Sequence, residues 1–373
     1  MASPNKGLKG ISRRGFLIAI TGSAVAAAAG CRPSEIIAPT PYVPGTSKGA
    51  GPTPQAAPTT GATVATSVDP KYGQVTFDKL MITTPDQLYI TQYDYSRTPD
   101  IDASTWSLKV DGLVDNPITI DYKAVKAFPA IEDTRALECI GNPLGGNLIG
   151  NVMWKGFDIQ EILKQVKVKS NATHARFEAA DGYSTSVELS WITQSGVLMA
   201  YEMDGAPLTV KHGFPLRILM PGLYGQKMPR WITRIEFIDH YYQGYWESGG
   251  WSDVASVQTN SIIAQPTDGY TTKPGASLAI EGVAWAGKRK ITTVEVQIES
   301  GPWMPATLVQ GPSPLAWTQW YLTWTAPAPG HYRIGVRATD ETGFVQSKEG
   351  TSLFGGSDLN GVSAIHRITV QAA

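Results

Sequence analysis

Cysteine is scarce in this chain: Cys31 and Cys139 are the only two among 373 residues. Two cysteines are too few for a disulfide framework or for a zinc site built from thiolates. They also leave the sequence without a CxxCH motif for haem attachment. The formal net charge of −1 provides no basic surplus for a nucleic-acid partner. Each of the two thiols therefore needs its own explanation.

Long apolar runs are missing as well. The apolar run over 16–29 is too short to cross a bilayer, and no other segment is long and apolar enough. Because this run follows Arg13-Arg14, we predict a twin-arginine export signal over 1–31. It ends in AAGC, which resembles a lipobox with Cys31 as the acylated residue; the alternative is cleavage at an alanine, with Cys31 discarded. We expect a periplasmic protein, or one on the outer face of the cytoplasmic membrane, with membrane contact only through this N-terminal anchor.

Glycine, proline and tryptophan are plentiful, with 38, 26 and 11 residues. This composition favours strands, turns and large buried aromatic side chains over helical bundles. Residues 32–70 are rich in Pro, Thr, Ala and Gly and carry few charges, which is typical of a disordered tether. The length suits about two folded domains, and we expect the first to begin near Lys71.

The patterns in 71–260 mix strands with short helices and show no regular βαβ alternation, which predicts an α+β domain. Residues 106–114 alternate apolar and polar residues and turn at Asp111-Gly112, which predicts a strand. Three other segments have readable patterns: a helix over 157–166 with Asp158 as N-cap, two strands over 175–189 around an Asp181-Gly182 turn, and a buried strand over 213–225 that reaches a Pro221-Gly222 turn.

After residue 261 the sequence pattern changes to short segments of alternating apolar and polar residues, separated by turns that contain glycine and proline. Five strands are predicted, within 277–287, 292–301, 317–324, 331–343 and 364–372. With no helical pattern between them, they predict an antiparallel β-sandwich of immunoglobulin type over 261–373. The cysteine pair of antibody domains is absent, so packing alone must hold this core.

Cys139 opens a run of Gly, Asn and Pro that is not regular core, and three interpretations of this thiol compete. A buried inert thiol is the commonest fate of a single cysteine. A nucleophile needs a nearby base, and none of the five histidines stands in a protease-like context. The third interpretation is a soft ligand to a metal already chelated by an organic cofactor, because one thiolate cannot hold a metal ion by itself. Export of a folded, cofactor-loaded protein favours the third.

Ordered motifs sharpen this interpretation. The run LECIGN around Cys139, followed by WKGFDIQEIL, resembles the segment of the molybdenum-ligating cysteine in the sulfite oxidase family. Further on, MAYEMDGAPLTVKHGFPLR and GQKMPRW resemble that family's later motifs, and YYQGYWESGGWSD leads into a segment similar to its C-terminal dimerisation domain. The likeness covers nearly all of 75–370 with the motifs in the same order.

The resemblance implies a molybdenum cofactor held by molybdopterin, with Cys139 as the protein's sulfur ligand to the metal. Contacts to the pterin and its phosphate are implied for a set of residues along the chain: Tyr93, Asn142, Asp181, His212, Arg217, Gly225, Gln226, Lys227 and Arg230. Asn142 has the alternative of orienting the loop. Tyr242 is implied beside the oxygen atom that is transferred. A phosphate suits the cations and glycine-exposed amides in this set.

The chain departs from true sulfite oxidases where that family has a pair of arginines after CxGN. Here the sequence reads Pro143-Leu144-Gly145-Gly146, and Arg135 is the candidate to replace part of the missing charge. Each lost charge-assisted hydrogen bond is worth about 1.5–3 kcal/mol, so sulfite is disfavoured as substrate. Thr91, Gln92 and Tyr93 stand where the family has an Arg-Asn-His stretch, a pattern nearer to the branch that includes the periplasmic methionine sulfoxide reductase.

The leading hypothesis is an exported molybdenum-cofactor oxidoreductase that transfers an oxygen atom to or from a small, sulfur-containing substrate. One alternative is a sulfoxide reductase of the periplasmic methionine sulfoxide reductase type. An alternative of another class is a non-catalytic binding lipoprotein. Without a haem motif, we expect a separate cytochrome or quinone-linked electron partner. The resemblance also implies a homodimer formed through the C-terminal domain.

Overall fold

The computed structural model describes residues 82–349 and 358–373. The predicted export signal, the lipobox at Cys31 and the tether over 32–70 lie outside these residues. Within the described ranges, no helix has the length and apolar character needed to cross a membrane.

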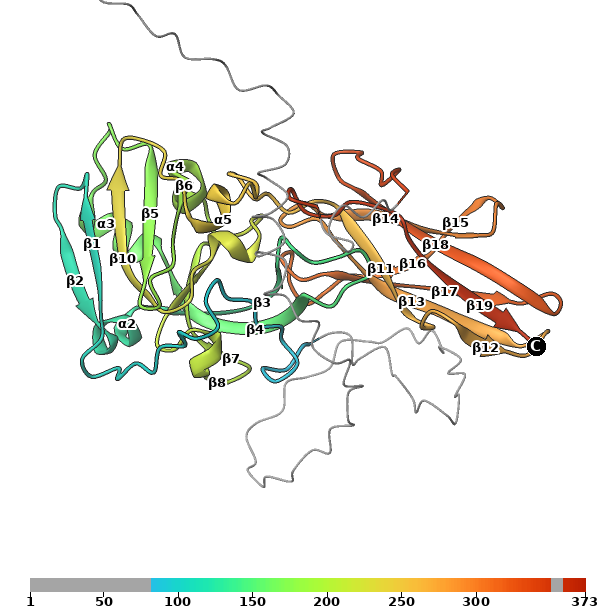
Figure 1. The fold of residues 1–373 in the computed structure, drawn as a ribbon. Coiled ribbons are helices and arrows are strands. Elements are labelled where there is room, and N and C mark those ends of the chain that lie inside the picture. Colours follow the sequence, from blue (N-terminus) through green and yellow to red (C-terminus); the bar gives the residue numbers. More distant parts are fainter. Residues whose placement is uncertain (1–81, 350–357) are drawn as a thin grey trace, which may run out of the picture. The chain divides into compact units, whose positions relative to one another are not determined.

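The first sheet has the strand order β2-β1-β10-β5-β6 (Figure 1). Its strands are β1 (Ser107–Gly112), β2 (Ile118–Asp121), β5 (His174–Ala179), β6 (Ser184–Glu188) and β10 (Ile232–Ile238). β1 pairs with β10 in parallel and the other pairs are antiparallel. The predicted strand over 106–114 and the strand pair around Asp181-Gly182 are thereby confirmed. Gly182 adopts φ +92°, a left-handed conformation that the turn requires.

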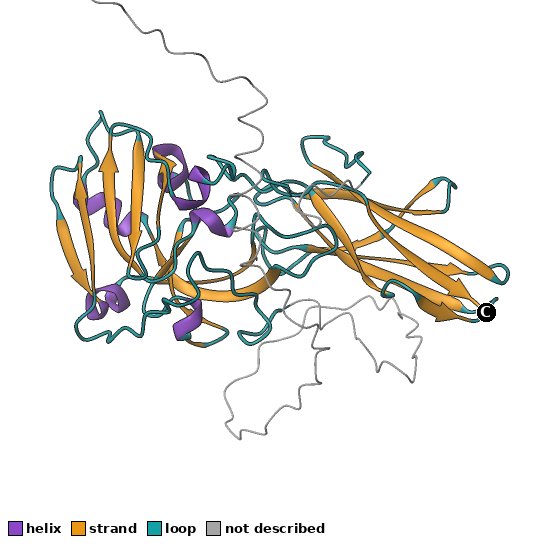
Figure 2. Cartoon of the chain, viewed as in Figure 1, coloured by secondary structure: helices purple, strands orange, loops and turns teal. Residues whose placement is uncertain are grey.

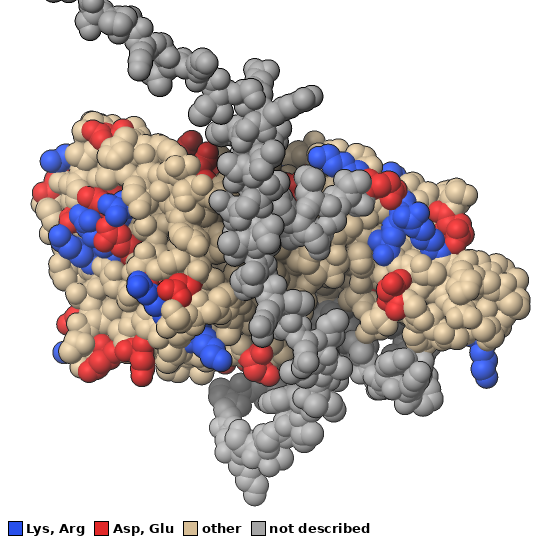
Figure 3. All heavy atoms as spheres, in the orientation of Figure 1, with Lys and Arg blue, Asp and Glu red and all other residues tan. Residues whose placement is uncertain are grey.

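The solvent side of this sheet carries a network of ion pairs. Arg234 on β10 contacts Asp111, Glu178 and Glu236. Arg176 on β5 shares two of these carboxylates. Figure 3 shows cationic and anionic side chains interspersed on the visible face of the molecule.

The second sheet has the order β3-β4-β7-β8, with β9 paired to β7. Its strands are β3 (Ala130–Glu138), β4 (Ile149–Asp158), β7 (Leu198–Met203), β8 (Ala206–Pro207) and β9 (Arg217–Leu219). The two sheets share one core, whose buried side chains include Trp154, Phe157, Phe177 and Phe237. The long β3–β4 hairpin carries the cysteine segment at its tip.

Helices are few and short, so this region is mostly β (Figure 2). They are α2 (Tyr122–Ala127), α3 (Gln160–Val166), α4 (Leu189–Thr193), α5 (Tyr245–Ser248) and the 3-10 turns η2 (Val210–His212) and η3 (Gly225–Lys227). α3 begins later than predicted and Ile159 is its N-cap, although the Asp158 carboxylate accepts a hydrogen bond from the Gln160 amide at 2.9 Å.

The buried strand predicted over 213–225 shrinks to β9, which spans three residues. Pro215 and Pro221 flank it, and proline has no N–H to donate to a sheet. The predicted turn after it is present, with Gly222 at φ +86°.

Two further sheets form the C-terminal part, with orders β11-β13-β17-β16 and β12-β19-β18-β14-β15. Their strands are β11 (Asn260–Gln265), β12 (Tyr270–Thr272), β13 (Ser277–Trp285), β14 (Ile291–Ile298), β15 (Trp303–Pro305), β16 (Thr307–Val309), β17 (Thr318–Thr325), β18 (Gly330–Asp340) and β19 (His366–Ala372). Both sheets contribute side chains to one core around Trp320. All five predicted strands are present; β11, β12, β15 and β16 were not predicted.

A third apolar cluster joins the β3–β4 hairpin to the C-terminal sheets. Ile140 and Ile149 pack there with Val283, Trp285 and Trp317. The free edge of β3 is also covered, because the Ala136 amide donates to the Leu315 carbonyl at 2.9 Å.

Candidate molybdenum cofactor site

Cys139 follows β3 directly and opens the cysteine loop, residues 139–148, which returns to β4. The backbone closes this loop on the cysteine: the Cys139 amide donates to the Leu148 carbonyl and the Asn142 amide to the Cys139 carbonyl, both at 2.9 Å. The thiol is half-buried. A Cβ added to Gly141 would lie 3.8 Å from Cys139 Sγ and 3.3 Å from the Trp251 ring, so Trp251 stands beside the thiol. This is not the apolar burial typical of an inert cysteine.

Asn142 braces the cysteine loop. Its amide nitrogen donates to Glu138 Oε1 at 3.0 Å, and its amide oxygen accepts from the Leu148 N–H at 2.9 Å. Burial raises the pKa of Glu138 to about 8, although hydrogen bonds from Asn142 and Trp285 oppose that change. Of the two roles predicted for Asn142, the geometry favours orienting the loop.

His212 ends the η2 turn and lies almost fully buried. Its Nε2 lies 2.8 Å from the Pro85 carbonyl oxygen, so Nε2 carries the proton. Burial lowers the pKa of His212 to about 4, with Arg217 and Arg230 acting in the same direction. The ring is therefore neutral at pH 7, with Nδ1 as a hydrogen-bond acceptor.

Arg217 and Arg230 form an arginine pair. Arg217 is 4% exposed and donates from Nη1 to the His212 carbonyl at 3.3 Å, while its Nε has no partner among the described residues. Arg230 donates to the carbonyls of Lys211 and Thr91 and to Gln92 Oε1. None of these acceptors, all in the described part of the chain, is a carboxylate.

The electrostatics of the arginine pair favour a bound anion. Burial and, to a smaller extent, the neighbouring Arg230 lower the pKa of Arg217 to about 9. Burial also lowers the pKa of Arg230. The Asp181 carboxylate partly offsets this for Arg230, but no carboxylate acts on Arg217. A buried cation such as Arg217 is costly unless an anion neutralises it.

Tyr89 lies between the thiol and the arginine pair, and the sequence analysis missed it. A Cβ added to Gly225 would lie 3.0 Å from the Tyr89 hydroxyl and 3.4 Å from the Glu138 carbonyl. Burial raises the pKa of Tyr89 well above its usual value; Cys139 adds to the increase and Arg217 opposes it. The only sequence signal was its place in LYITQYDY, two residues before Thr91.

Tyr93 and Asp181, both predicted to contact the pterin, lie next to each other. The Tyr93 hydroxyl donates to the Asp181 carbonyl, and the Asp181 carboxylate accepts from the Tyr183 amide at 3.0 Å. Burial raises the pKa of Asp181, whereas the Tyr183 amide and Arg230 lower it. Both side chains therefore stabilise the turn after β5.

The η3 turn brings Gly225 and Gln226 close to the thiol but places the cation of Lys227 elsewhere. Gln226 is buried, and its Oε1 has no hydrogen-bond partner among the described residues. Lys227 is fully buried and paired with Glu247, with further bonds to Thr185 Oγ1 and the Ser186 carbonyl. This pairing neutralises Lys227, so the geometry does not support the phosphate contact predicted for it.

Tyr242 and Arg135 have partners outside the cysteine loop. The Tyr242 hydroxyl lies 2.8 Å from Ser184 Oγ, and its ring is stacked on Arg176 at 4.3 Å. Arg135 pairs with Asp133 at 3.1 Å and donates to the Gly196 carbonyl. Neither position supports the catalytic roles predicted from the sequence.

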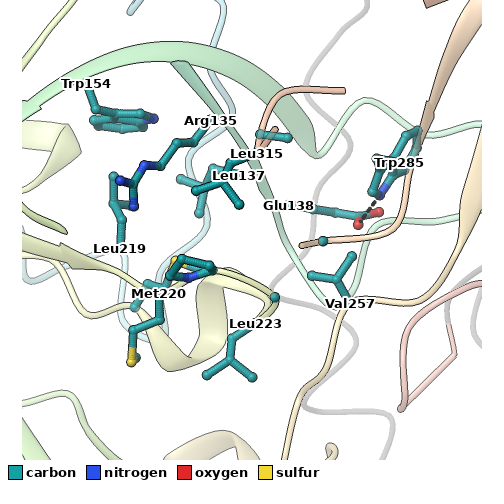
Figure 4. Close-up of a pocket in the computed structure, with 15 residues that line it drawn as sticks. Arg135, Leu137, Glu138, Trp154, Leu219, Met220, Leu223, Val257, Trp285 and Leu315 are labelled. Atoms are coloured by element: carbon teal, nitrogen blue, oxygen red, sulfur yellow. Dashed lines mark hydrogen bonds between the residues drawn. The ribbon is translucent and has the colours of Figure 1, made fainter. Parts of the chain in front are cut away.

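A cavity of about 30 Å³ lies along the end of β3, between that strand and residues 219–223 (Figure 4). Its lining includes Arg135, Glu138 and Trp285, but not Cys139 or Arg217. The cavity has room for about one water molecule. Because it lacks these two residues, it is not the candidate cofactor site.

A row of aromatic rings runs from Tyr183 to the thiol. Tyr93 lies 5.7 Å from Tyr183 and 5.0 Å from Tyr245. Tyr245 contacts Trp246 at 5.0 Å, and Trp246 contacts Trp251 at 6.4 Å. This aromatic row ends beside Cys139 and includes the half-exposed Tyr245.

The residues fit a metal held by an anionic organic cofactor. In residues 82–349 and 358–373, no group of three His, Cys, Asp or Glu side chains is placed to hold a metal ion. A single soft thiolate suits a metal that another molecule already chelates. The arginine pair, in which Arg217 has no carboxylate partner among the described residues, suits an anionic group such as a phosphate. The Gln226 Oε1, which has no partner among those residues, suits a ring N–H.

Family models match both halves of the chain. Residues 95–246 match the oxidoreductase molybdopterin binding domain, and residues 252–372 match the Mo-co oxidoreductase dimerisation domain. The cofactor is therefore molybdenum bound by molybdopterin.

Curated relatives agree with these matches. The chain is 28% identical over 344 residues to the mitochondrial sulfite oxidase of Drosophila melanogaster, covering 77% of this chain and 59% of that protein. It is 28% identical over 339 residues to the mitochondrial sulfite oxidase of Homo sapiens, covering 77% and 61%. It is also 34% identical over 171 residues to the uncharacterized oxidoreductase YuiH of Bacillus subtilis, covering 45% and 84%. The chain thus spans about three fifths of the length of these sulfite oxidases.

A solved structure shares the fold. The sulfane dehydrogenase SoxCD from Paracoccus pantotrophus superimposes with a TM-score of 0.64 at 21% identity, covering 74% of this chain and 80% of that one. The family models, the curated relatives and this fold extend over the segments that carry Cys139 and the arginine pair. The chain belongs to the sulfite oxidase family of molybdopterin oxidoreductases.

Proposed function

We propose that this protein is an exported enzyme that transfers an oxygen atom to or from a small, sulfur-containing substrate, with Cys139 as the protein ligand to molybdenum. One observation carries the proposal: a half-buried thiol opens a braced loop, and the neighbouring Tyr89, whose pKa responds to both Cys139 and Arg217, connects it to a buried arginine that no carboxylate neutralises. A non-catalytic binding protein has no use for that combination.

The bound cofactor supplies the two-electron redox chemistry of molybdenum. The chain's residues hold and orient it. Arg217 and Arg230 bind its anionic end, and the neutral His212 offers an acceptor at Nδ1. Trp251 and the Cys139 thiol both lie against Gly141 of the cysteine loop.

The substrate we favour carries little charge. The cysteine loop contains Pro143, Leu144 and two glycines where a sulfite pocket has cations. Arg135, the candidate replacement, is paired with Asp133. The aromatic row instead offers apolar and polarisable surface, which suits a thioether or sulfoxide sulfur. A sulfoxide reductase is therefore the second candidate, and this same observation favours it.

Assays in both directions separate the two candidates. Methionine sulfoxide is offered with reduced viologen dye, and sulfite is offered with cytochrome c as acceptor. Turnover of the sulfoxide alone supports the reductase, and turnover of sulfite alone supports the oxidase. Turnover of neither, in protein loaded with molybdenum, contradicts both substrate assignments.

We further propose a homodimer formed through the C-terminal sheets, which we interpret as an immunoglobulin-like sandwich. The two sheets with a common core support this reading. Electrons would pass to a separate cytochrome or quinone-linked partner. Twin-arginine export and acylation at Cys31 complete the proposal, and light scattering and lipid labelling test these parts.

Metal analysis of the exported protein tests the central claim. We expect stoichiometric molybdenum in the wild type, and Cys139→Ser should abolish oxygen transfer and change the Mo(V) resonance spectrum. Cys31→Ser is the matched control, because it removes the other thiol and should change neither. Wild-type protein without molybdenum, or a Cys139→Ser variant with the wild-type spectrum and activity, would refute the proposal.

A further inference from the structure

A tryptophan of the C-terminal sheets contacts the base of the cysteine loop. Trp285, the last residue of β13, donates from its indole N–H to Glu138 Oε2 at 2.6 Å. The two residues are 147 positions apart, and both are buried. Figure 4 shows this bond as a dashed line between Glu138 and Trp285. The neighbour of the predicted metal ligand is thus held by the other half of the chain.

A series of hydrogen bonds leads from Trp285 to the cysteine. The second oxygen of Glu138 accepts from Asn142, and Asn142 in turn accepts from the Leu148 amide. The Leu148 carbonyl then accepts from the Cys139 amide at 2.9 Å. Because neighbouring bonds of this series share the Glu138 carboxylate, the Asn142 amide group and the Leu148 peptide, we expect loss of the first bond to loosen the others.

A histidine of the same sheets lies against the far side of the cysteine loop. His366 Nδ1 accepts from the Ile263 amide at 3.0 Å, so the neutral ring carries its proton on Nε2. A Cβ added to Gly145 would lie 2.4 Å from His366 Nε2. Gly145 also adopts φ +70°, which glycine tolerates best. The ring therefore packs directly on the loop backbone.

We propose that Trp285, with support from His366, positions the cysteine loop so that the Cys139 thiolate faces the metal. This inference rests on the proposed role of Cys139. Trp285 is a positioning residue, because it acts through Glu138 and Asn142 and touches neither cofactor nor substrate. The C-terminal sheets are then part of the scaffold of the metal site, in addition to any role in dimerisation.

The test compares two tryptophan variants. Trp285→Phe removes the indole N–H that holds Glu138. Trp320→Phe is the matched control, because Trp320 is fully buried in the core of the same sheets and its indole N–H has no partner among the described residues. Glu138→Gln keeps the side-chain shape but replaces one of the two carboxylate oxygens that accept from Trp285 and Asn142. Thermal unfolding of all three confirms that folded proteins are compared.

The first measurement uses cofactor-free protein. Alkylation of Cys139 is followed by peptide mass spectrometry, which separates it from Cys31. Loss of one buried hydrogen bond should expose the thiol about tenfold more often, so alkylation should be about tenfold faster in Trp285→Phe and Glu138→Gln than in Trp320→Phe. The double variant Trp285→Phe/Glu138→Gln should be no faster than either single one, because both act through one bond.

The second measurement uses the holoenzyme. Trp285→Phe and Glu138→Gln should broaden or shift the Mo(V) resonance, whereas Trp320→Phe should leave it unchanged. If the wild type contains molybdenum and all variants match the control in alkylation and in spectrum, the positioning role is wrong while the proposed function stands. If the wild type contains no molybdenum, the proposed function fails, and the positioning role fails with it.

Discussion

Replacing Arg217 by methionine should stabilise the cofactor-free protein and weaken cofactor binding at the same time. Arg217 is 4% exposed, and its Nε has no partner among the described residues. The fall of its pKa from 12.5 to about 9 corresponds to roughly 4–5 kcal/mol of unfavourable burial of the charge, at about 1.4 kcal/mol per pH unit. A protein keeps such a side chain at that cost only if something bound there needs it.

The expected change in the free energy of unfolding follows from the contacts that the Arg217→Met substitution removes. The variant loses the weak bond to the His212 carbonyl and the stacking of the guanidinium on Trp154, at 5.1 Å. These contacts are worth about 1–3 kcal/mol together. The cofactor-free protein should therefore gain about 1–4 kcal/mol in free energy of unfolding. The cofactor should bind roughly tenfold to a hundredfold more weakly, for the loss of one charge-assisted contact.

Urea unfolding of cofactor-free protein measures the first effect, and molybdenum and pterin content after dialysis measures the second. Arg234→Met is the control, because Arg234 contacts three carboxylates on the outer face of β10. That variant should lose about 1 kcal/mol and keep its cofactor. If Arg217→Met instead destabilises the cofactor-free protein and retains full molybdenum, Arg217 is a structural residue and the reasoning is refuted.

Three other predictions concern stability. Lys227→Met leaves Glu247 buried without its cation and should lower the free energy of unfolding in urea by about 3–5 kcal/mol. Replacing Glu247 with leucine as well should recover most of that loss. A loss below about 1 kcal/mol would contradict the ion pair. Burial raises the pKa of Asp340, but hydrogen bonds from Thr and Arg289 side chains outweigh this and lower it to about 2. Because this lies below the unfolded value of about 3.9, the stabilisation is present above pH 4 and is lost toward pH 2, so the difference in melting temperature between wild type and Asp340→Asn should shrink over that range; a constant difference would contradict it. Tyr93→Phe removes the bond to the Asp181 carbonyl and should cost about 1 kcal/mol while the molybdenum content stays unchanged; lost molybdenum would instead show direct contact with the cofactor.

Local patterns determined a large part of the fold. Alternation of apolar and polar residues predicted β1 and the five long C-terminal strands, because each of these strands buries one face on a core. The Asp181-Gly182 turn was readable for a similar reason, since only a few residue types adopt its conformation easily. The short strands β12, β15 and β16 were missed, because three residues carry no periodicity.

In the candidate site, too, some features could be predicted from the sequence and others could not. The sequence by itself determined that Cys139 opens a glycine-rich loop and that HGFPLR places His212 and Arg217 together, since these are neighbours along the chain. Only the tertiary structure decided which cationic side chains are free of an ion pair and can bind an anionic cofactor. Lys227 is neutralised by Glu247 and Arg135 by Asp133, whereas Arg217 is buried beside Arg230 and has no carboxylate partner among the described residues.

The tertiary structure also decided what surrounds the thiol. Tyr89, Trp251 and Trp285 reach the cysteine loop from 50 to 146 positions away in sequence, and no local pattern identifies them. The physical reason is that a side chain's conformation depends on its neighbours in the chain, whereas its charge and its hydrogen bonds are settled by whatever folding brings within a few ångströms of it.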